Sequence, residues 1–95
     1  MTNPTIPTPT PTPENWQVID NKLVREFKFK NFQEALEWSV QVAMIAEEVN
    51  HHPEIMFTWG RVVISITTHD AGNQVTAKDI DLANDINDLE ADLVD

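Results

Sequence analysis

The chain has 95 residues, which suits one small domain. Its 16 acidic and 6 basic residues give a net charge of −10. This excess argues against nucleic acids and anionic membrane surfaces as partners, because both are bound through Lys and Arg. Cysteine is absent, which rules out disulfides and thiolate chemistry. No apolar run approaches the roughly 20 residues of a membrane span, and the first residues lack the features of a secretory signal, so we expect a cytoplasmic protein.

The N-terminal stretch differs in composition from the rest of the chain. Residues 1–13 hold five of the six prolines, most of them next to threonine. Prolines at this density neither continue a helix nor pair within a sheet, so we predict an extended, flexible tail. The folded domain is then expected at residues 14–95.

Four segments have the alternating pattern of strands, and they form two consecutive pairs. The first pair turns at residues 20–21 and the second at Gly60. The predicted strands are Gln17–Ile19, Lys22–Phe29, Ile55–Trp59 and Val62–His69. In the last of these, Val62, Ile64, Ile66 and Thr68 are expected on one face, and the intervening residues, ending in His69, on the other.

Two segments have helical periodicity. The first spans Phe32–Val49, with Asn31 as N-cap, and we predict that Pro53 ends it, because the residue before a proline avoids helical angles. The second follows the N-cap Thr76. The apolar residues expected to face the core are Trp38, Val42, Ile45 and Val49 with a flank of Ala35, Ser39, Ala43 and Ala46 in the first helix, and Leu82, Ile86, Leu89 and Leu93 in the second. The order β-β-α-β-β-α predicts an α+β fold, in which one four-stranded antiparallel sheet carries both helices on one face.

The three histidines of the chain lie near the predicted ends of these elements. His51 and His52 follow the first helix, and His69 ends the last strand. Imidazole takes and gives protons near neutral pH more readily than other side chains. If that strand runs beside the end of the helix, the three rings meet in one pocket suited to general acid–base catalysis.

Two carboxylates and two tryptophans accompany the histidines. Glu47 precedes His51 by four residues and would share its helix face, where a carboxylate orients an imidazole and favours its charged form. Asp79, in the first turn of the second helix, is expected near the same place. Trp59 and Trp16 would supply a flat wall for a planar ligand.

Each of these residues also has a structural explanation. Histidines at a helix C-terminus complement the helix dipole, and a proline such as Pro53 commonly follows them. Asp79 lies three residues after Thr76 and suits the first turn of a helix. Zinc or iron binding is a further alternative, but adjacent histidines are poor co-ligands and the sequence has no His-x-x-x-His motif or cysteine pair, so we predict no metal. The joint spacing of the residues, rather than any one of them, favours a catalytic site.

Several segments resemble one known family. AEEVNHHPEI at residues 46–55, THDAG at 68–72 and KDIDLA at 78–83 are similar to the signature of the pterin-4a-carbinolamine dehydratases. The stretch LVREFKF at 23–29 also resembles that family. The resemblance extends over about residues 14–95, and the combined pattern is specific where the histidine pair alone is not.

The resemblance implies the α+β fold and an enzyme that removes water from 4a-hydroxytetrahydropterin to give quinonoid dihydropterin, in the recycling of tetrahydrobiopterin-type cofactors. His51 and His69 would then be the general acid and base, in an order that the sequence leaves open, and His52 would position the pterin. The residues expected to support them are Glu47, Asp79, Trp16, Thr68 and Pro53. The resemblance implies no cofactor and no metal.

The resemblance also bears on partners. Members of this family form homodimers or homotetramers through sheet and helix contacts, and some relatives are non-catalytic dimerisation cofactors or assembly chaperones. The alternative function is therefore a protein-interaction module on the same fold.

This chain departs from the family pattern in two places. Proline-rich residues replace a helix that often precedes the first strand, and the loop at residues 72–75 is one residue longer than in many members.

Overall fold

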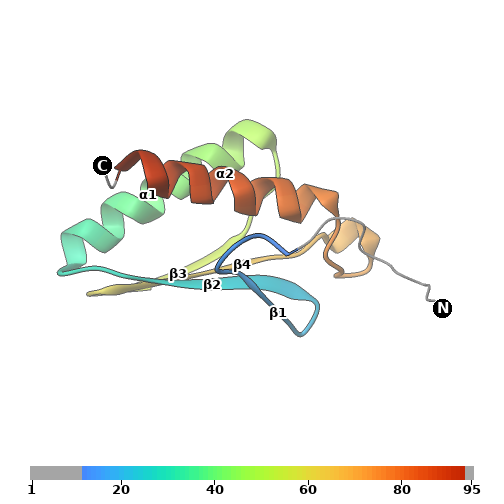
Figure 1. Cartoon of the computed structure of the whole chain (residues 1–95), viewed down its shortest axis with the longest axis horizontal. Helices are drawn as coiled ribbons and strands as arrows, with labels where there is room; N and C mark the ends of the chain where they lie inside the picture. The colour runs from blue at the N-terminus through green and yellow to red at the C-terminus, as the bar shows by residue number, and fades with distance from the viewer. Residues whose placement is uncertain (1–11, 94–95) are drawn as a thin grey trace.

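The computed structural model describes residues 12–93, apart from the side chain of residue 93. These residues form two layers, a four-stranded sheet and two helices that cover one of its faces (Figure 1). The predicted element order and the α+β class are confirmed, and a short 3-10 helix, η1 (His69–Ala71), is added before the last helix. Residues 1–11 of the predicted tail and the side chain of Leu93 lie outside the described residues.

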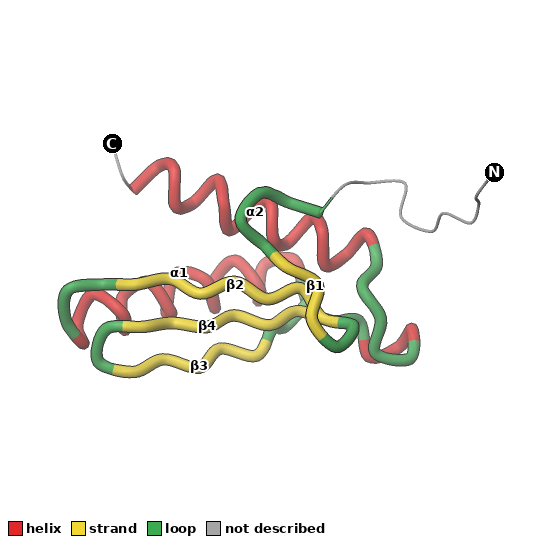
Figure 2. Tube along the Cα trace, turned by 60° about the horizontal axis from the view of Figure 1, so that its bottom comes forward, coloured by secondary structure: helices red, strands yellow, loops and turns green. Residues whose placement is uncertain are grey.

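The sheet has the strand order β1-β2-β4-β3, and every neighbouring pair is antiparallel (Figure 2). The strands are β1 (Gln17–Ile19), β2 (Lys22–Lys28), β3 (Glu54–Thr58) and β4 (Arg61–Ile66). In the central pair, Leu23 lies beside Ile66 and Phe27 beside Val62, and all four side chains are buried. Ile64 is buried as well, so the alternation predicted for β4 is confirmed.

Both predicted hairpin turns are present, and each has a local cause. Asp20 and Asn21 adopt left-handed φ angles of 52° and 64°, which short polar side chains tolerate and which two-residue hairpin turns require. At the second turn, the Phe29 N–H donates to the Gly60 carbonyl at 2.8 Å. A Cβ at Gly60 would lie 3.0 Å from the Phe29 carbonyl oxygen, so this close approach of two backbones requires glycine.

The last strand is shorter than predicted. β4 does not reach His69, because the chain turns at Thr68 into a tight loop. The Thr68 N–H donates to the Gln74 carbonyl at 3.0 Å, which makes an isolated bridge instead of another pair in the sheet. Thr67, expected on the face opposite Thr68, is buried as well, and its hydroxyl donates to the Asn21 carbonyl at 3.0 Å.

The first helix, α1, spans Phe32–Val49 as predicted. At its start, Asn31 is extended and its side chain accepts a hydrogen bond from the Glu34 N–H at 2.8 Å. The Glu34 carboxylate reaches back to the Lys30 N–H at 3.2 Å. The predicted N-cap is confirmed, since the Glu34 N–H, which the helix itself leaves unpaired, finds a partner, as does the Lys30 N–H just before the cap.

The end of α1 is set by asparagine and not by proline. Asn50 adopts a left-handed φ of 56°, its N–H donates to the Glu47 carbonyl, and the His51 N–H donates to the Ala46 carbonyl. This pair of bonds is the Schellman arrangement, which satisfies the last carbonyls of a helix. The prediction that Pro53 stops the helix is therefore wrong, because the chain has already left helical geometry three residues earlier.

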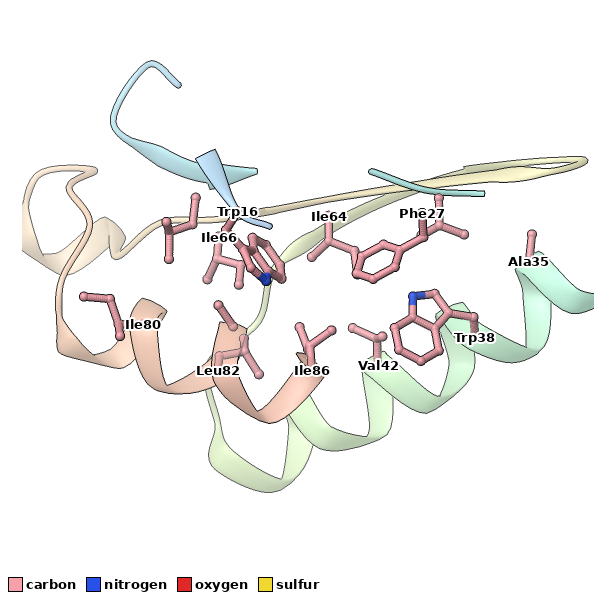
Figure 3. Packing of buried hydrophobic residues seen from close by; sticks show 13 residues of the cluster. Trp16, Phe27, Ala35, Trp38, Val42, Ile64, Ile66, Ile80, Leu82 and Ile86 are labelled. Atoms are coloured by element: carbon pink, nitrogen blue, oxygen red, sulfur yellow. The ribbon is translucent and has the colours of Figure 1, made fainter. Parts of the chain in front are cut away.

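The core lies between the sheet and one face of each helix (Figure 3). Its residues are Trp16, Leu23, Phe27, Ala35, Trp38, Val42, Val62, Ile64, Ile66, Ile80, Leu82, Ala83 and Ile86. The predicted helical faces are wrong at two positions. Ala43 is exposed, because it lies about 80° round the helix from the centre of the buried face. Val49 is 48% exposed, because it borders the open groove between the helices.

Arg25 connects the second helix, α2 (Ala77–Leu93), to the sheet. Its guanidinium lies 4.2 Å from the Phe27 ring centroid and donates to both carboxylate oxygens of Glu90 at 2.8 and 2.9 Å. It also donates to Asn87 Oδ1 at 2.6 Å, an oxygen that Trp16 Nε1 shares at 2.9 Å. These half-buried contacts fix how α2 lies across β2, and so place the start of α2 near the end of β4.

Acidic residues line the groove between the helices. Burial raises the pKa of Asp85, and the negative charges of Asp88, Asp81 and Glu48 raise it further. Between the ordinary and the raised pKa, the folded chain holds more protons at this carboxyl than the unfolded chain does. The contribution of Asp85 therefore lowers the free energy of unfolding as the pH rises through that window.

We expect Asp85→Asn to stabilise the protein at pH 7. The substitution removes like-charge pairs with Asp81 and Asp88, each worth about 0.2–0.5 kcal/mol on a helix, so the Tm should rise by roughly 2–5 °C. The gain should vanish at about pH 3, where the carboxyl is protonated in both states. Thermal unfolding followed by circular dichroism at both pH values measures this. Asp70→Asn is the control. An equal rise in Tm for this variant would show that the effect comes from the lower net charge alone.

Candidate active site

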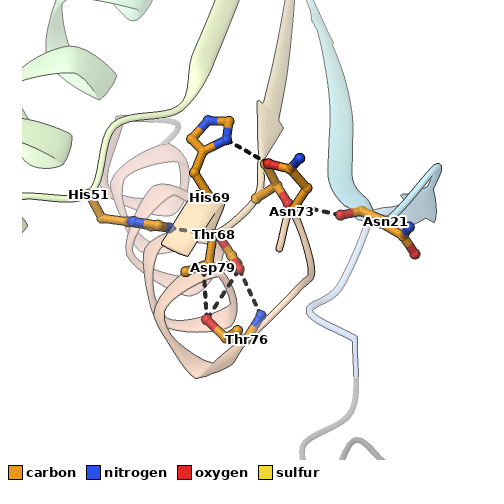
Figure 4. Close-up of polar contacts among 8 residues, drawn as sticks. Asn21, His51, Thr68, His69, Asn73, Thr76 and Asp79 are labelled. Atoms are coloured by element: carbon orange, nitrogen blue, oxygen red, sulfur yellow. Dashed lines mark hydrogen bonds and ion pairs between the residues drawn. The ribbon is translucent and has the colours of Figure 1, made fainter. Parts of the chain in front are cut away.

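The candidate site is built around one buried carboxylate. Asp79 is the third residue of α2 and is fully buried. Its Oδ2 accepts from the Thr76 N–H at 2.7 Å and from the Thr68 hydroxyl at 2.7 Å (Figure 4). The Thr76 and Thr68 hydroxyls are themselves 2.7 Å apart. The carboxylate thus caps the N-terminus of α2, as the spacing from Thr76 predicted, and ties it to the end of β4.

The second oxygen of the same carboxylate holds a histidine. Asp79 Oδ1 lies 2.6 Å from His51 Nε2, and the His51 side chain is only 15% exposed. The Schellman arrangement at Asn50 fixes the backbone of His51 and directs it away from α1 towards α2. The sequence offered helix capping and imidazole binding as alternative roles for Asp79. In the structure Oδ2 caps the helix and Oδ1 binds the imidazole.

His52 turns in another direction and takes a different partner. Its Nε2 lies 2.8 Å from Glu47 Oε1, and both side chains are largely exposed. The sequence placed Glu47 beside His51 on a continuing helix. That prediction is wrong, because the left-handed residue Asn50 removes His51 from the helical face and leaves His52 within reach of Glu47.

His69 is the first residue of η1 and is exposed. Its Nδ1 lies 2.7 Å from Asn73 Oδ1, and the loop that carries both residues is closed by several backbone bonds to the Thr68 carbonyl. Thr68 therefore contributes twice, through its hydroxyl to Asp79 and through its carbonyl to the loop of His69.

The three histidines line one hollow. Its volume is about 280 Å³, and it is lined by Asn50, His51, His52, Thr67, Thr68, His69, Asp70 and Lys78. A second hollow of about 260 Å³ shares His52, Thr67 and His69 and adds Pro53 and Lys22 among its lining residues. The hollow thus brings together residues from the end of α1, the end of β4 and the start of α2. This is the arrangement expected if β4 runs beside the end of α1.

The two tryptophans do not supply the expected flat wall. Trp16 is 5% exposed within the core and lines neither hollow. It is held there by the bond from its Nε1 to Asn87 and by edge-to-face contact with Phe27. Trp59 is 70% exposed at the β3–β4 turn, at the end of β3 away from the histidines. Both predictions failed because a tryptophan in an α+β protein can pack in the core or lie at a turn as readily as it can contact a ligand.

Two further findings concern the described part of the chain. Within it, no group of three or more His, Cys, Asp or Glu side chains has an arrangement that could hold a metal ion. Neither of its helices combines the length and apolar character needed to cross a bilayer.

Several known proteins are similar to this chain in sequence. The family model described as pterin 4 alpha carbinolamine dehydratase matches residues 2–89. The chain belongs to this family. A relative from Picosynechococcus is 45% identical over 74 residues, covering 78% of this chain and 79% of the relative. Another from Sulfolobus acidocaldarius is 43% identical over 77 residues, covering 81% and 84%. Both carry the provisional name pterin-4-alpha-carbinolamine dehydratase.

Two solved structures have the same fold. A transcriptional coactivator/pterin dehydratase from Brucella melitensis superposes with a TM-score of 0.71 at 38% identity, covering 78% of this chain and 80% of the other. A pterin dehydratase-like protein, identified as a RuBisCO assembly factor in the alpha-carboxysome, superposes with a TM-score of 0.62. That protein is 20% identical, covering 78% of this chain and 84% of the other, and at this level the likeness concerns the fold alone.

Sequence analysis missed two residues of the site. Asn50 ends α1 and aims His51, and an asparagine directly after the last periodic residue was a usable signal for a left-handed cap. Asn73, which bonds to His69, carried no such signal. A loop asparagine has many uses, and the contact depends on how residues 69–74 fold back on Thr68.

We expect Thr68→Val to weaken the fold and the site together. The change keeps the shape of the side chain but removes a donor to a fully buried carboxylate, which should lower the free energy of unfolding by about 1–3 kcal/mol. Urea denaturation measures the loss. Thr58→Val is the matched control, because Thr58 is exposed and its hydroxyl contact is long, at 3.5 Å, so its effect should stay within about 0.5 kcal/mol. Equal effects of the two substitutions would contradict the role given to Thr68.

Proposed function

We propose that this chain catalyses the dehydration of 4a-hydroxytetrahydropterin to quinonoid dihydropterin. The observation that carries the proposal is the convergence of three imidazoles on one hollow, each with a hydrogen-bond partner that fixes its ring. Membership of the pterin 4 alpha carbinolamine dehydratase family supports the choice of substrate class. Such an activity would serve the recycling of tetrahydrobiopterin-type cofactors.

The reaction needs two proton transfers. The C4a–O bond breaks as the hydroxyl takes up a proton and leaves as water. N5 loses its proton, and the electron pair of that N–H bond forms the C4a=N5 double bond. One protonated and one neutral imidazole can carry out both transfers without a metal or an organic cofactor.

The contacts of the histidines suggest separate tasks. His51 and His69 come from different elements and can approach a ligand from different directions, so we assign them the acid and base roles. His52, beside Pro53 where the two hollows meet, would position the pterin. The ionised Asp79 carboxylate would stabilise positive charge on His51 while that ring carries a proton, and Glu47 would do the same for His52.

The size of the site supports a small substrate. Pockets for small molecules usually have about 300–1,000 Å³, and the hollow of the three histidines lies just below that range at about 280 Å³. It suits one bicyclic ring, with any substituent extending into the adjoining hollow or into solvent.

The proposal is tested by stopped-flow decay of enzymatically generated 4a-hydroxytetrahydropterin. Positioned acid–base groups contribute about 10²–10⁴-fold, so His51→Ala, His52→Ala and His69→Ala should each lower the catalysed rate at least about tenfold. Gln41→Ala, on the exposed side of α1, is the matched control and should keep the wild-type rate. If wild type and all three histidine variants merely show the spontaneous rate, the chain is not a dehydratase and an interaction module on the same fold becomes the better assignment.

One observation favours contacts with protein, in addition to catalysis. Phe32, Leu36, Val40 and Met44 follow one another at four-residue spacing along α1, so they share one side of the helix. Their exposures are 52%, 41%, 48% and 66%. A continuous apolar row of this kind marks a protein interface, and we propose that it joins copies of this chain in a homodimer or homotetramer.

A charge placed in this row should separate the copies. We expect wild type to sediment as a dimer or tetramer and Val40→Glu to sediment as a monomer, because the carboxylate would have to be buried without a partner. Gln41→Glu adds the same charge one residue away and should leave the assembly intact. A wild type that is monomeric at about 100 μM in analytical ultracentrifugation would exclude this interface.

A further inference from the structure

We propose that Asn73 is a positioning residue that holds His69 in the tautomer with the proton on Nδ1, so that Nε2, the ring nitrogen that Asn73 does not use, keeps a free lone pair. This inference rests on the proposed dehydration only where turnover is concerned. The tautomer itself follows from the geometry of the loop and can be measured without any substrate.

The contact that carries the inference joins two side chains of one short loop. His69 Nδ1 lies 2.7 Å from Asn73 Oδ1 (Figure 4). An amide oxygen accepts hydrogen bonds and cannot donate them, so the proton of this bond belongs to the imidazole. In a neutral ring the other nitrogen, Nε2, is then an acceptor, and a neutral imidazole with a directed lone pair is what a general base requires.

The loop holds Asn73 firmly in place for this contact. The Thr68 carbonyl accepts from the N–H groups of Ala71 at 3.2 Å, Asn73 at 3.1 Å and Gln74 at 3.4 Å. Gly72 and Asn73 have successive left-handed φ angles of 78° and 59°, which bring the chain back over the start of η1. Asparagine is among the few residues that adopt this conformation readily, so Asn73 supplies both the backbone turn and the acceptor.

The other two histidines are held in the opposite way. His51 and His52 use Nε2 for their bonds to Asp79 and Glu47, whereas His69 uses Nδ1. His51 and His52 each face a carboxylate, which stabilises an imidazolium, but His69 faces a neutral amide, which gives no comparable stabilisation. The arrangement therefore sets His69 apart as the ring suited to accept a proton, with Asn73 acting through it.

The experiment is a long-range ¹H–¹⁵N correlation spectrum of ¹⁵N-labelled protein at about pH 8.5, above the ordinary imidazole range. Wild-type His69 should show protonated Nδ1 and unprotonated Nε2, the minor form of the free side chain. Asn73→Gly keeps the left-handed backbone available and removes the acceptor, so His69 should become a mixture of tautomers. Asn73→Asp restores an acceptor and should restore the Nδ1–H form. Gln74→Gly adds flexibility to the same loop without removing this contact, and should leave the tautomer unchanged.

Turnover provides the second measurement. Loss of a residue that orients a general base leaves the base less often in its reactive form, so kcat in Asn73→Gly should fall about tenfold with little change in KM. A wild-type His69 protonated on Nε2, or an unchanged tautomer in Asn73→Gly, would overturn the inference even if the enzyme is active. If the tautomers are as expected but the protein has no dehydratase activity, the proposed function is refuted. The role of Asn73 in fixing the tautomer of His69 is then still supported.

Discussion

One buried carboxyl group determines which ends of the helices and strands pack together in this domain. Asp79 is fully buried, and an unpaired carboxylate in that position would cost several kcal/mol. The fold must therefore bring donors to both of its oxygens. They come from the first residue before α2, from the chain just after β4 and from the residue that follows the cap of α1. Satisfying one side chain thus brings three element ends together, and all three histidines lie at or next to those ends.

Regular elements could be predicted from the sequence because their signals are local. The bounds of α1, the turn at Asp20 and Asn21 and the inward residues of β4 follow from periodicity, caps and turn chemistry. The errors lie where a single residue overrides the pattern. Asn50 ended the helix before Pro53 and changed which histidine Glu47 could reach. The asparagine at position 50 is a local signal for the cap, but which histidine Glu47 then reaches depends on the course of the chain after the cap.

The convergence of the histidines was predictable for a different reason. Their spacing matches a family signature, and the matching of residues 2–89 to that family carries information about contacts far apart in the chain. Trp16 shows the limit of such transfer. The resemblance assigned Trp16 to the site, but the hydrogen bond to Asn87 and the contact with Phe27 place the ring inside the core of the described structure.

The anchoring of α2 has a consequence for folding. Both hairpins and α1 are stabilised by contacts between near neighbours, but the bonds of Arg25 to Asn87 and Glu90 close loops of 62 and 65 residues. Contacts across such separations form late, because their loop-closure entropy is paid before they contribute. The hollow between the histidines depends on the docking of α2, because Lys78 lines it and Asp79 binds His51. A small molecule that binds there therefore has no complete site while α2 is undocked, and its binding stabilises the whole domain by an amount that grows with the free ligand concentration.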